Sequence, residues 1–184
     1  MMKDRIIGQG SHLKLVEINW IDDEGNKRKW EAVKRMTTGT GIVSVMAITD
    51  ESEIIFVSQY RPPVGGEVIE FPAGLCDQKG EALEETALRE LQEETGYRAK
   101  KIEKLFAGPV SAGLSFEFLT VFWATDLEFV GKKDGREERG ITVYKIPFKE
   151  ADEWLRGMEK KGMLVDVKLW ARISYIKDIL SVAD

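Results

Sequence analysis

The sequence predicts a mixed α/β fold, and three observations support this class. Two short apolar runs, 42–48 and 54–59, have the length and composition of buried strands. Segment 81–95 contains no Gly or Pro and is rich in Ala, Leu and Glu, so it favours a helix that ends at Gly96. A second apolar stripe with helical spacing begins near Val167. A chain of 184 residues is long enough for one well-formed core.

The N-terminal part is predicted to be a small β appendage. Segments 13–20 and 27–35 alternate partly between apolar and polar residues on either side of the turn-forming stretch 22–26. This arrangement is typical of a β-hairpin. We therefore divide the chain into an appendage at 1–40 and a main domain at 41–184.

Further strands and two helices are predicted after residue 63. After the breakers Pro62-Pro63 and Gly65-Gly66, the sequence predicts strands at 68–71, 102–106, 116–124 and 141–146, with a charged loop at 128–140. It then predicts a short helix at 149–158. The final helix carries an apolar stripe of Leu169, Ile173, Ile176 and Leu180.

Composition and charge exclude several classes of function. The net charge of -5 argues against a nucleic-acid or anionic-membrane surface, since both need an excess of Lys and Arg. The single cysteine, Cys76, excludes an internal disulfide framework, and no apolar run reaches the length of a membrane span. We expect a cytoplasmic protein. The single histidine, His12, argues against Ser-His-Asp, Cys-His and His-rich zinc chemistry.

The helix predicted at 81–95 carries acidic residues on its apolar side. At about 100° per residue, Glu90, Glu93 and Glu94 lie on or beside the arc occupied by Leu83, Ala87 and Leu91. Glu81, Glu84, Glu85 and Gln92 occupy the opposite arc and are expected to face solvent. Like charges at these spacings repel each other, and burial increases the cost.

Such a cluster needs a cation, and Arg89 alone does not neutralise three carboxylates. Oxygen ligands without Cys or His favour a hard divalent ion, with Mg²⁺ preferred and Mn²⁺ as the alternative. Mg²⁺ commonly binds phosphate oxygens jointly with carboxylates. The cluster therefore indicates phosphoryl chemistry, in which a metal polarises phosphorus and lowers the pKa of an attacking water.

Residues 74–81 and 89–97 resemble the Nudix box, the pattern G, five residues, E, seven residues, REUxEExGU, with U a bulky apolar residue. The match is complete from Glu81 onward, with Tyr97 in the last U position. It departs at the start, because six residues separate Gly74 from Glu81. The extra residue lies in the loop before the helix and is expected to leave the carboxylates in place.

Four further segments, 30–35, 59–63, 70–75 and 113–115, are similar to the ADP-sugar pyrophosphatase branch of the Nudix hydrolases. The resemblance implies an α/β/α Nudix sandwich with a mixed sheet, preceded by the β appendage. It also implies a homodimer that exchanges this appendage. The implied activity is Mg²⁺-dependent cleavage of ADP-ribose or a related nucleoside diphosphate sugar to a nucleoside monophosphate and a sugar phosphate.

The same resemblance assigns roles to individual residues. Glu90 and Glu94 correspond to the main metal ligands, with Glu93 beside them and the carbonyl of Ala73 as a further ligand. Glu81 and Arg89 correspond to the pair that orients the box. Substrate contacts are implied for Arg35 and Arg61 on phosphates, Trp30 on the base, and Glu31 and Glu70 on polar groups. A water-activating glutamate is implied in 132–140, where Glu137 is preferred over Glu138.

Two other functions stay open from the sequence. One keeps the fold and changes the nucleotide, to a GDP-sugar or an oxidised nucleoside triphosphate. The other is a regulator that binds nucleotide sugars without hydrolysis. The complete set of box carboxylates argues against the regulator, because a non-catalytic domain has no need to retain them.

Overall fold

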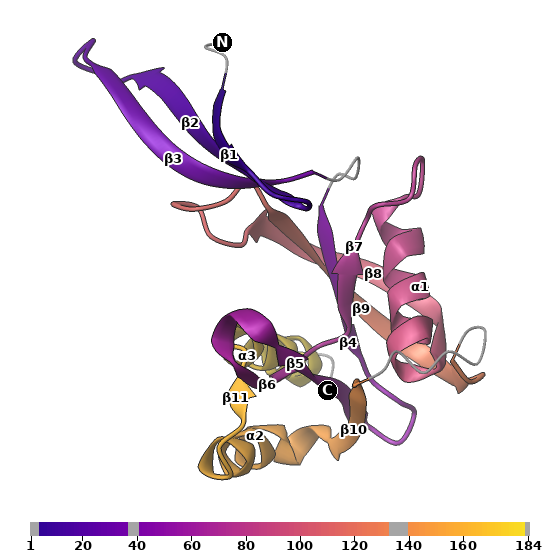
Figure 1. The fold of residues 1–184 in the computed structure, drawn as a ribbon. Helices are drawn as coiled ribbons and strands as arrows, with labels where there is room; N and C mark the ends of the chain where they lie inside the picture. The colour runs from indigo at the N-terminus through magenta and orange to yellow at the C-terminus, as the bar shows by residue number, and fades with distance from the viewer. Residues whose placement is uncertain (1–3, 37–40, 133–139, 183–184) are drawn as a thin grey trace.

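The computed structural model describes residues 4–36, 41–132 and 140–182, and Figure 1 shows how the elements are arranged. Three antiparallel strands form the appendage: β1 (Arg5–Gln9), β2 (Leu13–Ile21) and β3 (Lys27–Arg35). The predicted hairpin is confirmed by the continuous pairing of β2 with β3. The Asp22 carboxylate stabilises its turn, since it accepts a 2.8 Å hydrogen bond from the backbone N–H of Asn26. Strand β1 was not predicted, because its five residues alternate too weakly between apolar and polar types.

The appendage extends away from the rest of the fold (Figure 1), and its strand β3 contacts residues 113–117. The backbone N–H of Val33 donates to the carbonyl of Leu114 at 2.7 Å, and Phe116 N–H donates to the carbonyl of Val33 at 3.3 Å. The division of the chain at residue 40 stays a prediction, because 37–40 lie outside the described residues.

Two four-stranded sheets form the centre of the main domain, and both contain parallel and antiparallel pairs. The first has the order β7 (Ala73–Leu75), β4 (Ile42–Ala47), β9 (Phe118–Phe129), β8 (Tyr97–Pro109). The second has the order β10 (Thr142–Pro147), β5 (Glu53–Arg61), β6 (Gly66–Glu70), β11 (Leu164–Val165). Parallel pairing of β4 with β9 and of β6 with β11 confirms the predicted mixed sheet.

Helices cover the sheets on two sides (Figure 1), which gives the predicted α/β/α sandwich. Helix α1 (Leu83–Thr95) covers one side, while α2 (Ala151–Lys160) and α3 (Lys168–Val182) cover the other. Short 3₁₀ turns, η1 (Pro62–Val64) and η3 (Phe148–Glu150), join neighbouring elements. Of the predicted stripe on α3, Leu169, Ile173 and Ile176 are buried, and the side chain of Leu180 lies outside the described residues.

Strand β4 shows why the apolar runs are continuous. Val43 and Val45 pack toward α1, whereas Met46 packs in the core beneath α2 and α3. A strand covered on both faces needs apolar residues at successive positions. Strand β8 is the opposite case: it is longer than predicted, because charged residues such as Lys100 and Glu103 lie on its exposed positions and hide it from an apolar-run search.

Candidate active site

Helix α1 carries the box carboxylates, and it ends where the sequence predicts. Gly96 adopts a left-handed conformation with φ of 80° and donates its N–H to the carbonyl of Gln92. The side of the helix that faces the sheets includes Glu90, which is 9% exposed, and Glu94, which is 4% exposed. Both were predicted on the apolar arc. Glu93 lies at its border, with its side chain 29% exposed.

The prediction that Glu81 faces solvent is wrong. Helix α1 begins at Leu83, so Glu81 lies in the preceding loop and has no position on the helical wheel. Its side chain is 11% exposed and accepts a 2.9 Å hydrogen bond from the Thr86 hydroxyl. Glu84 and Glu85 are exposed, as predicted, and Glu85 accepts the N–H of Ala82 at the start of the helix.

Arg89 holds three of the carboxylates. Its Nε donates to Glu81 at 2.8 Å, and its Nη1 donates to Glu90 at 2.7 Å and to Glu93 at 2.9 Å. Its Nη2 also donates to the carbonyl of Leu75 at 3.4 Å. Hydrogen bonds from the guanidinium, first of all to Glu81, raise the pKa of Arg89 well above its usual value. One planar cation therefore fixes the orientation of the acidic cluster.

Strand β7 passes directly over this cluster. A Cβ at Gly74 would lie 2.0 Å from the Cδ of Glu90, so any larger residue there would displace this carboxyl group. The neighbouring backbone N–H of Ala73 donates to a carboxylate oxygen of Glu94 at 3.1 Å. The first glycine of the box is thus explained by the close approach of the backbone to a carboxylate, and the Ala73 peptide lies beside Glu94.

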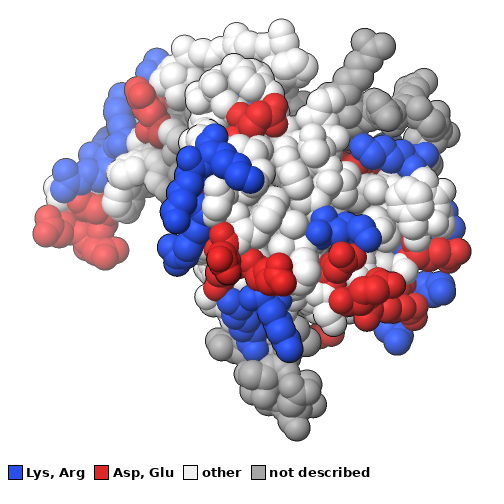
Figure 2. Space-filling view, turned by 90° about the horizontal axis from the view of Figure 1, so that it is seen from below, with Lys and Arg blue, Asp and Glu red and all other residues white. Residues whose placement is uncertain are grey.

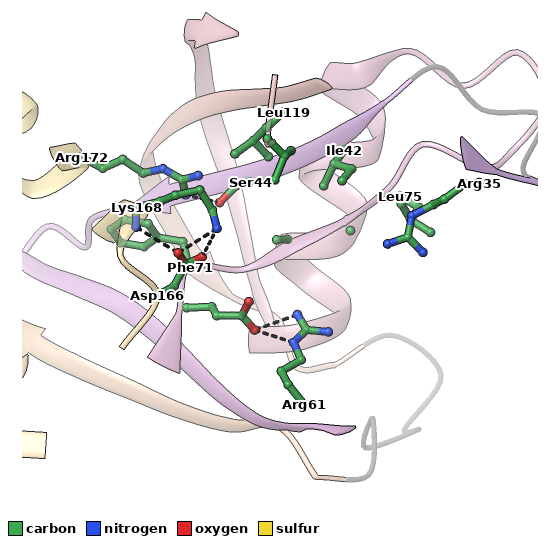
Figure 3. Close-up of a pocket in the computed structure, with 14 residues that line it drawn as sticks. Arg35, Ile42, Ser44, Arg61, Phe71, Leu75, Leu119, Asp166, Lys168 and Arg172 are labelled. Carbon is green, nitrogen blue, oxygen red and sulfur yellow. Dashed lines mark hydrogen bonds and ion pairs between the residues drawn. The ribbon is translucent and has the colours of Figure 1, made fainter. Parts of the chain in front are cut away.

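Two cavities meet at this strand. One, of about 450 Å³, is lined by Arg89, Glu90, Glu93 and Glu94. The other, of about 320 Å³, extends toward α3 and is shown in Figure 3. They share Arg61 and the strand Ala73–Leu75 as lining residues.

Arg61 and Glu70 form an ion pair at the junction of the cavities. Arg61 donates to Glu70 through Nε at 2.8 Å and through Nη2 at 2.7 Å. Burial raises the pKa of the Glu70 carboxyl, and the charge of Arg61 opposes that effect. The arginine is 40% exposed in its side chain and is accessible to an anionic group in either cavity.

The predicted substrate-contact residues of the appendage lie farther from the acidic cluster than Arg61 and Glu70 do. Arg35 lines the end of the cavity in Figure 3 that is opposite to α3, and it forms an ion pair with Glu117. Trp30 is 50% exposed and donates its indole N–H to the carbonyl of Gly113 at 2.9 Å. Glu31 is exposed on the same strand. Neither Trp30 nor Glu31 lines one of the two cavities.

The predicted water-activating residue is not placed by the structure, since Glu137 and Glu138 lie outside the described residues.

Cys76 is buried and donates its thiol to the carbonyl of Glu81 at 3.3 Å. It therefore packs against the loop before α1.

The structure adds four cavity residues that sequence reasoning missed: Ser44, Asp166, Lys168 and Arg172. Ser44 interrupts the apolar run of β4, and Arg172 falls within the apolar stripe of α3. A polar residue within or directly beside a predicted apolar pattern was the available signal for both. The sequence around Asp166 and Lys168 contains no pattern that indicates a position in a cavity.

The acidic cluster has the composition of a divalent-metal site. The carboxylates of Glu81, Glu90 and Glu93 pair with Arg89, and that of Glu94 accepts the backbone N–H of Ala73. The side chains of Glu90 and Glu93 are partly withdrawn from solvent. Across the described residues, no three His, Cys, Asp or Glu side chains are already arranged around one ion position. The donor chemistry of these carboxylates fits a hard cation.

The charges on the outer surface are mixed. On the face in Figure 2, Lys and Arg side chains lie among Asp and Glu side chains in small groups. No helix in the described part of the chain is long and apolar enough to span a membrane.

Comparisons with known proteins agree with the geometry. An ADP-ribose pyrophosphatase of Bacillus subtilis is 38% identical over 154 residues, which cover 83% of this chain and 78% of that protein. A GDP-mannose pyrophosphatase of Escherichia coli is 27% identical over 188 residues, covering 96% and 94%. A solved structure described as an ADP compounds hydrolase shares the fold with a TM-score of 0.70, at 21% identity, covering 83% and 81%. The NUDIX domain matches residues 40–163, and the chain therefore belongs to the Nudix family.

Proposed function

We propose that this protein hydrolyses the diphosphate bond of ADP-ribose or a related nucleoside diphosphate sugar, releasing a nucleoside monophosphate and a sugar phosphate. The observation that carries the proposal is the junction of two cavities at Arg61 and Ala73–Leu75. A diphosphate bound there lies between an arginine and the carboxylate cluster. The relatives named as ADP-ribose and GDP-mannose pyrophosphatases support the same reaction class.

The metal in this proposal is Mg²⁺, with Mn²⁺ as the alternative. Glu90, Glu93, Glu94 and the carbonyl of Ala73 are the proposed ligands. A divalent ion bound there supplies a Lewis acid for the phosphoryl oxygens and a lower pKa for a bound water.

The remaining roles belong to the protein's own side chains. Arg89 holds Glu81, Glu90 and Glu93 in fixed orientations, so the cluster is organised before substrate arrives. Arg61 and Arg35 are proposed to bind the phosphates. Trp30, Glu31 and Glu70 are assigned to the base and to polar groups of the substrate, and Glu137 to activation of water.

A substrate panel tests the activity. ADP-ribose, ADP-glucose, GDP-mannose and 8-oxo-dGTP are incubated with the purified protein and Mg²⁺, and products are separated by chromatography. We expect AMP and ribose 5-phosphate from ADP-ribose. Glu94→Gln should lower turnover by about 10² or more, as expected for a displaced or missing ligand group. Glu84→Gln, on the exposed side of the same helix, is the control. Equal turnover in both variants would refute the assignment.

Binding of the metal is tested without turnover. We expect Mg²⁺ or Mn²⁺ to raise the melting temperature of the wild type, because a ligand that binds only the folded state stabilises it. Glu94→Gln should reduce the shift, and Glu84→Gln should retain it. A shift that is unchanged by Glu94→Gln places the metal elsewhere.

The GDP-mannose pyrophosphatase relative covers nearly the whole chain, which keeps a GDP-sugar as the second candidate substrate. Both candidates use the same carboxylates and differ at the base. Preference for GDP-mannose over ADP-ribose in the substrate panel would select it.

A cytoplasmic homodimer completes the proposal. Large apolar side chains remain exposed on the appendage, among them Ile6 at 51%, Trp20 at 44% and Ile21 at 54%. Exposed apolar surface of this extent commonly marks a protein interface. A second copy of the chain is the partner that the family resemblance favours.

A further inference from the structure

Arg172 of α3 is a buried cation whose charge is not matched by a close carboxylate. The residue is 5% exposed, and its Nη1 donates to the Ser44 hydroxyl oxygen at 2.9 Å. Its Cζ lies 5.9 Å from the centre of the Phe71 ring. Among the described residues it makes no ion pair, and Asp166 and Glu70 attract it only from a longer range.

This arrangement is costly unless a ligand completes it. Burial lowers the pKa of Arg172, because the charged form loses hydration that the protein does not fully replace. A guanidinium has five N–H donors, and Ser44 accepts from one nitrogen. Within the described residues, no fully enclosed side-chain nitrogen or oxygen lacks a partner. The remaining donors of Arg172 therefore keep some open surface, and the cavity in Figure 3 provides it.

Lys168 adds a second cation at the same end of the cavity. Its ammonium lies 2.6 Å from a carboxylate oxygen of Asp166, so the two charges balance each other. The positive charge of Arg172 is then the surplus at this end. Figure 3 shows Lys168, Asp166, Arg172 and Ser44 together, well separated from Arg35.

The position of this group relative to the hydrolytic site decides what it can contact. The cavity is continuous from Arg35 at one end, past Arg61, to Arg172 at the other. A diphosphate beside Arg61 with its base toward the appendage places the sugar toward α3. An acidic group on that sugar would meet the guanidinium of Arg172.

We propose that Arg172, Lys168 and the Ser44 hydroxyl form a subsite for an oxyanion, either phosphate or carboxylate, carried by the sugar of the substrate. The preferred substrates are then nucleoside diphosphate sugars with an acidic substituent on the sugar. This inference rests on the proposed hydrolysis and specifies its substrate class. The Ser44 oxygen accepts from Arg172, so its own O–H is available to donate to the anion.

Kinetics on matched substrates test the subsite. We compare ADP-ribose, ADP-ribose phosphorylated on the terminal ribose, and an ADP-linked sugar acid. The wild type should show a KM about tenfold or more lower for an acidic substrate, as expected for a charge-assisted hydrogen bond. Arg172→Met should remove most of this difference while kcat changes little. Preference for the phosphate or for the carboxylate identifies the anion.

The control is Arg156→Met, since Arg156 is an exposed arginine that stacks on Trp170 outside the cavity. It should keep the preference of the wild type. Unfolding experiments separate binding from packing: a buried charge replaced by an apolar side chain of similar size should leave stability equal or higher. Equal KM values for acidic and neutral substrates in the wild type would overturn the inference. An Arg172→Met variant that raises the KM values for acidic and neutral substrates by the same factor would also overturn it.

A measurement independent of turnover separates this inference from the proposed function. Inorganic phosphate is titrated into ¹⁵N-labelled protein without metal, and backbone amide shifts are followed by NMR. Saturable shifts at Ser44, Lys168 and Arg172 that Arg172→Met abolishes support the subsite, even if no substrate in the panel is hydrolysed. Shifts confined to the Arg61 and Gly74 region overturn it.

Discussion

The Cα of Gly74 lies so close to the carboxyl group of Glu90 that a methyl group at Gly74 would stand 2.0 Å from Cδ and 2.1 Å from Oε1. These atoms come from β7 and α1, so the contact fixes the distance between a strand backbone and a helix side chain. Glu90 is also bound to Arg89, which limits its freedom to move aside. The glycine is therefore needed for the position of one carboxylate.

Gly74→Ala is expected to abolish most of the hydrolytic activity while the protein remains folded. A displacement of about 1 Å in a catalytic group can cost about 10² in rate. Activity is measured on ADP-ribose, and folding by circular dichroism. Gly108→Ala is the control, because a Cβ there has no neighbour within 4 Å. Full activity of Gly74→Ala would show that the Glu90 carboxylate can relocate without consequence.

Arg89→Lys is expected to destabilise the fold by about 3 kcal/mol, because it leaves partly buried carboxylates with fewer donors. A lysine has one ammonium group, which does not reach Glu81, Glu90 and Glu93 together as the guanidinium does. The free energy of unfolding is measured in urea without metal. Arg98→Lys, an exposed arginine hydrogen-bonded to Gln92, should change it little. Similar losses in the two variants would argue against a special role for Arg89.

The helix and its buried carboxylates could be predicted because acidic residues occupy positions on the apolar side of a helical repeat. A spacing of about 100° per residue placed Glu90 and Glu94 on the same side of the helix as Leu91, and all three are buried in the structure. The same helical spacing gave a wrong position for Glu81, because the start of a helix depends on local capping, which a periodic pattern does not detect. The error matters because Glu81 is a main partner of Arg89.

The end of the cavity at α3 was not predictable in the same way. Ser44, Phe71 and Arg172 are far apart in sequence and meet only because β4, the end of β6 and α3 pack together. The sequence pattern of each element is local and carries no information on which elements are neighbours in the fold. Local periodicity therefore predicted the side of the site that carries the carboxylates, and tertiary packing determined the other side.

Acidic pH is expected to affect stability through Glu70. Burial raises the pKa of its carboxyl above the ordinary 4.5, so the folded chain binds this proton more tightly than the unfolded chain. The stability gained from the proton is present below pH 4.5 and is lost as the pH rises through the folded pKa. The difference in unfolding free energy between wild type and Glu70→Gln should therefore fall from about pH 4 to pH 7. Glu67→Gln, exposed on the same strand, is the control. A difference that does not vary with pH would contradict this reasoning.

The appendage is expected to lose its proposed dimer contact when charge is placed on its exposed apolar side. Leu13 and Leu15 are two residues apart on β2, so they lie on one face, and they are 43% and 39% exposed. Leu15→Glu should shift the mass measured by light scattering from two chains toward one, because a buried unpaired charge opposes association. Lys14→Gln, on the other face of the strand, should leave the mass unchanged. A wild type with the mass of a single chain at all concentrations would refute the proposed dimer.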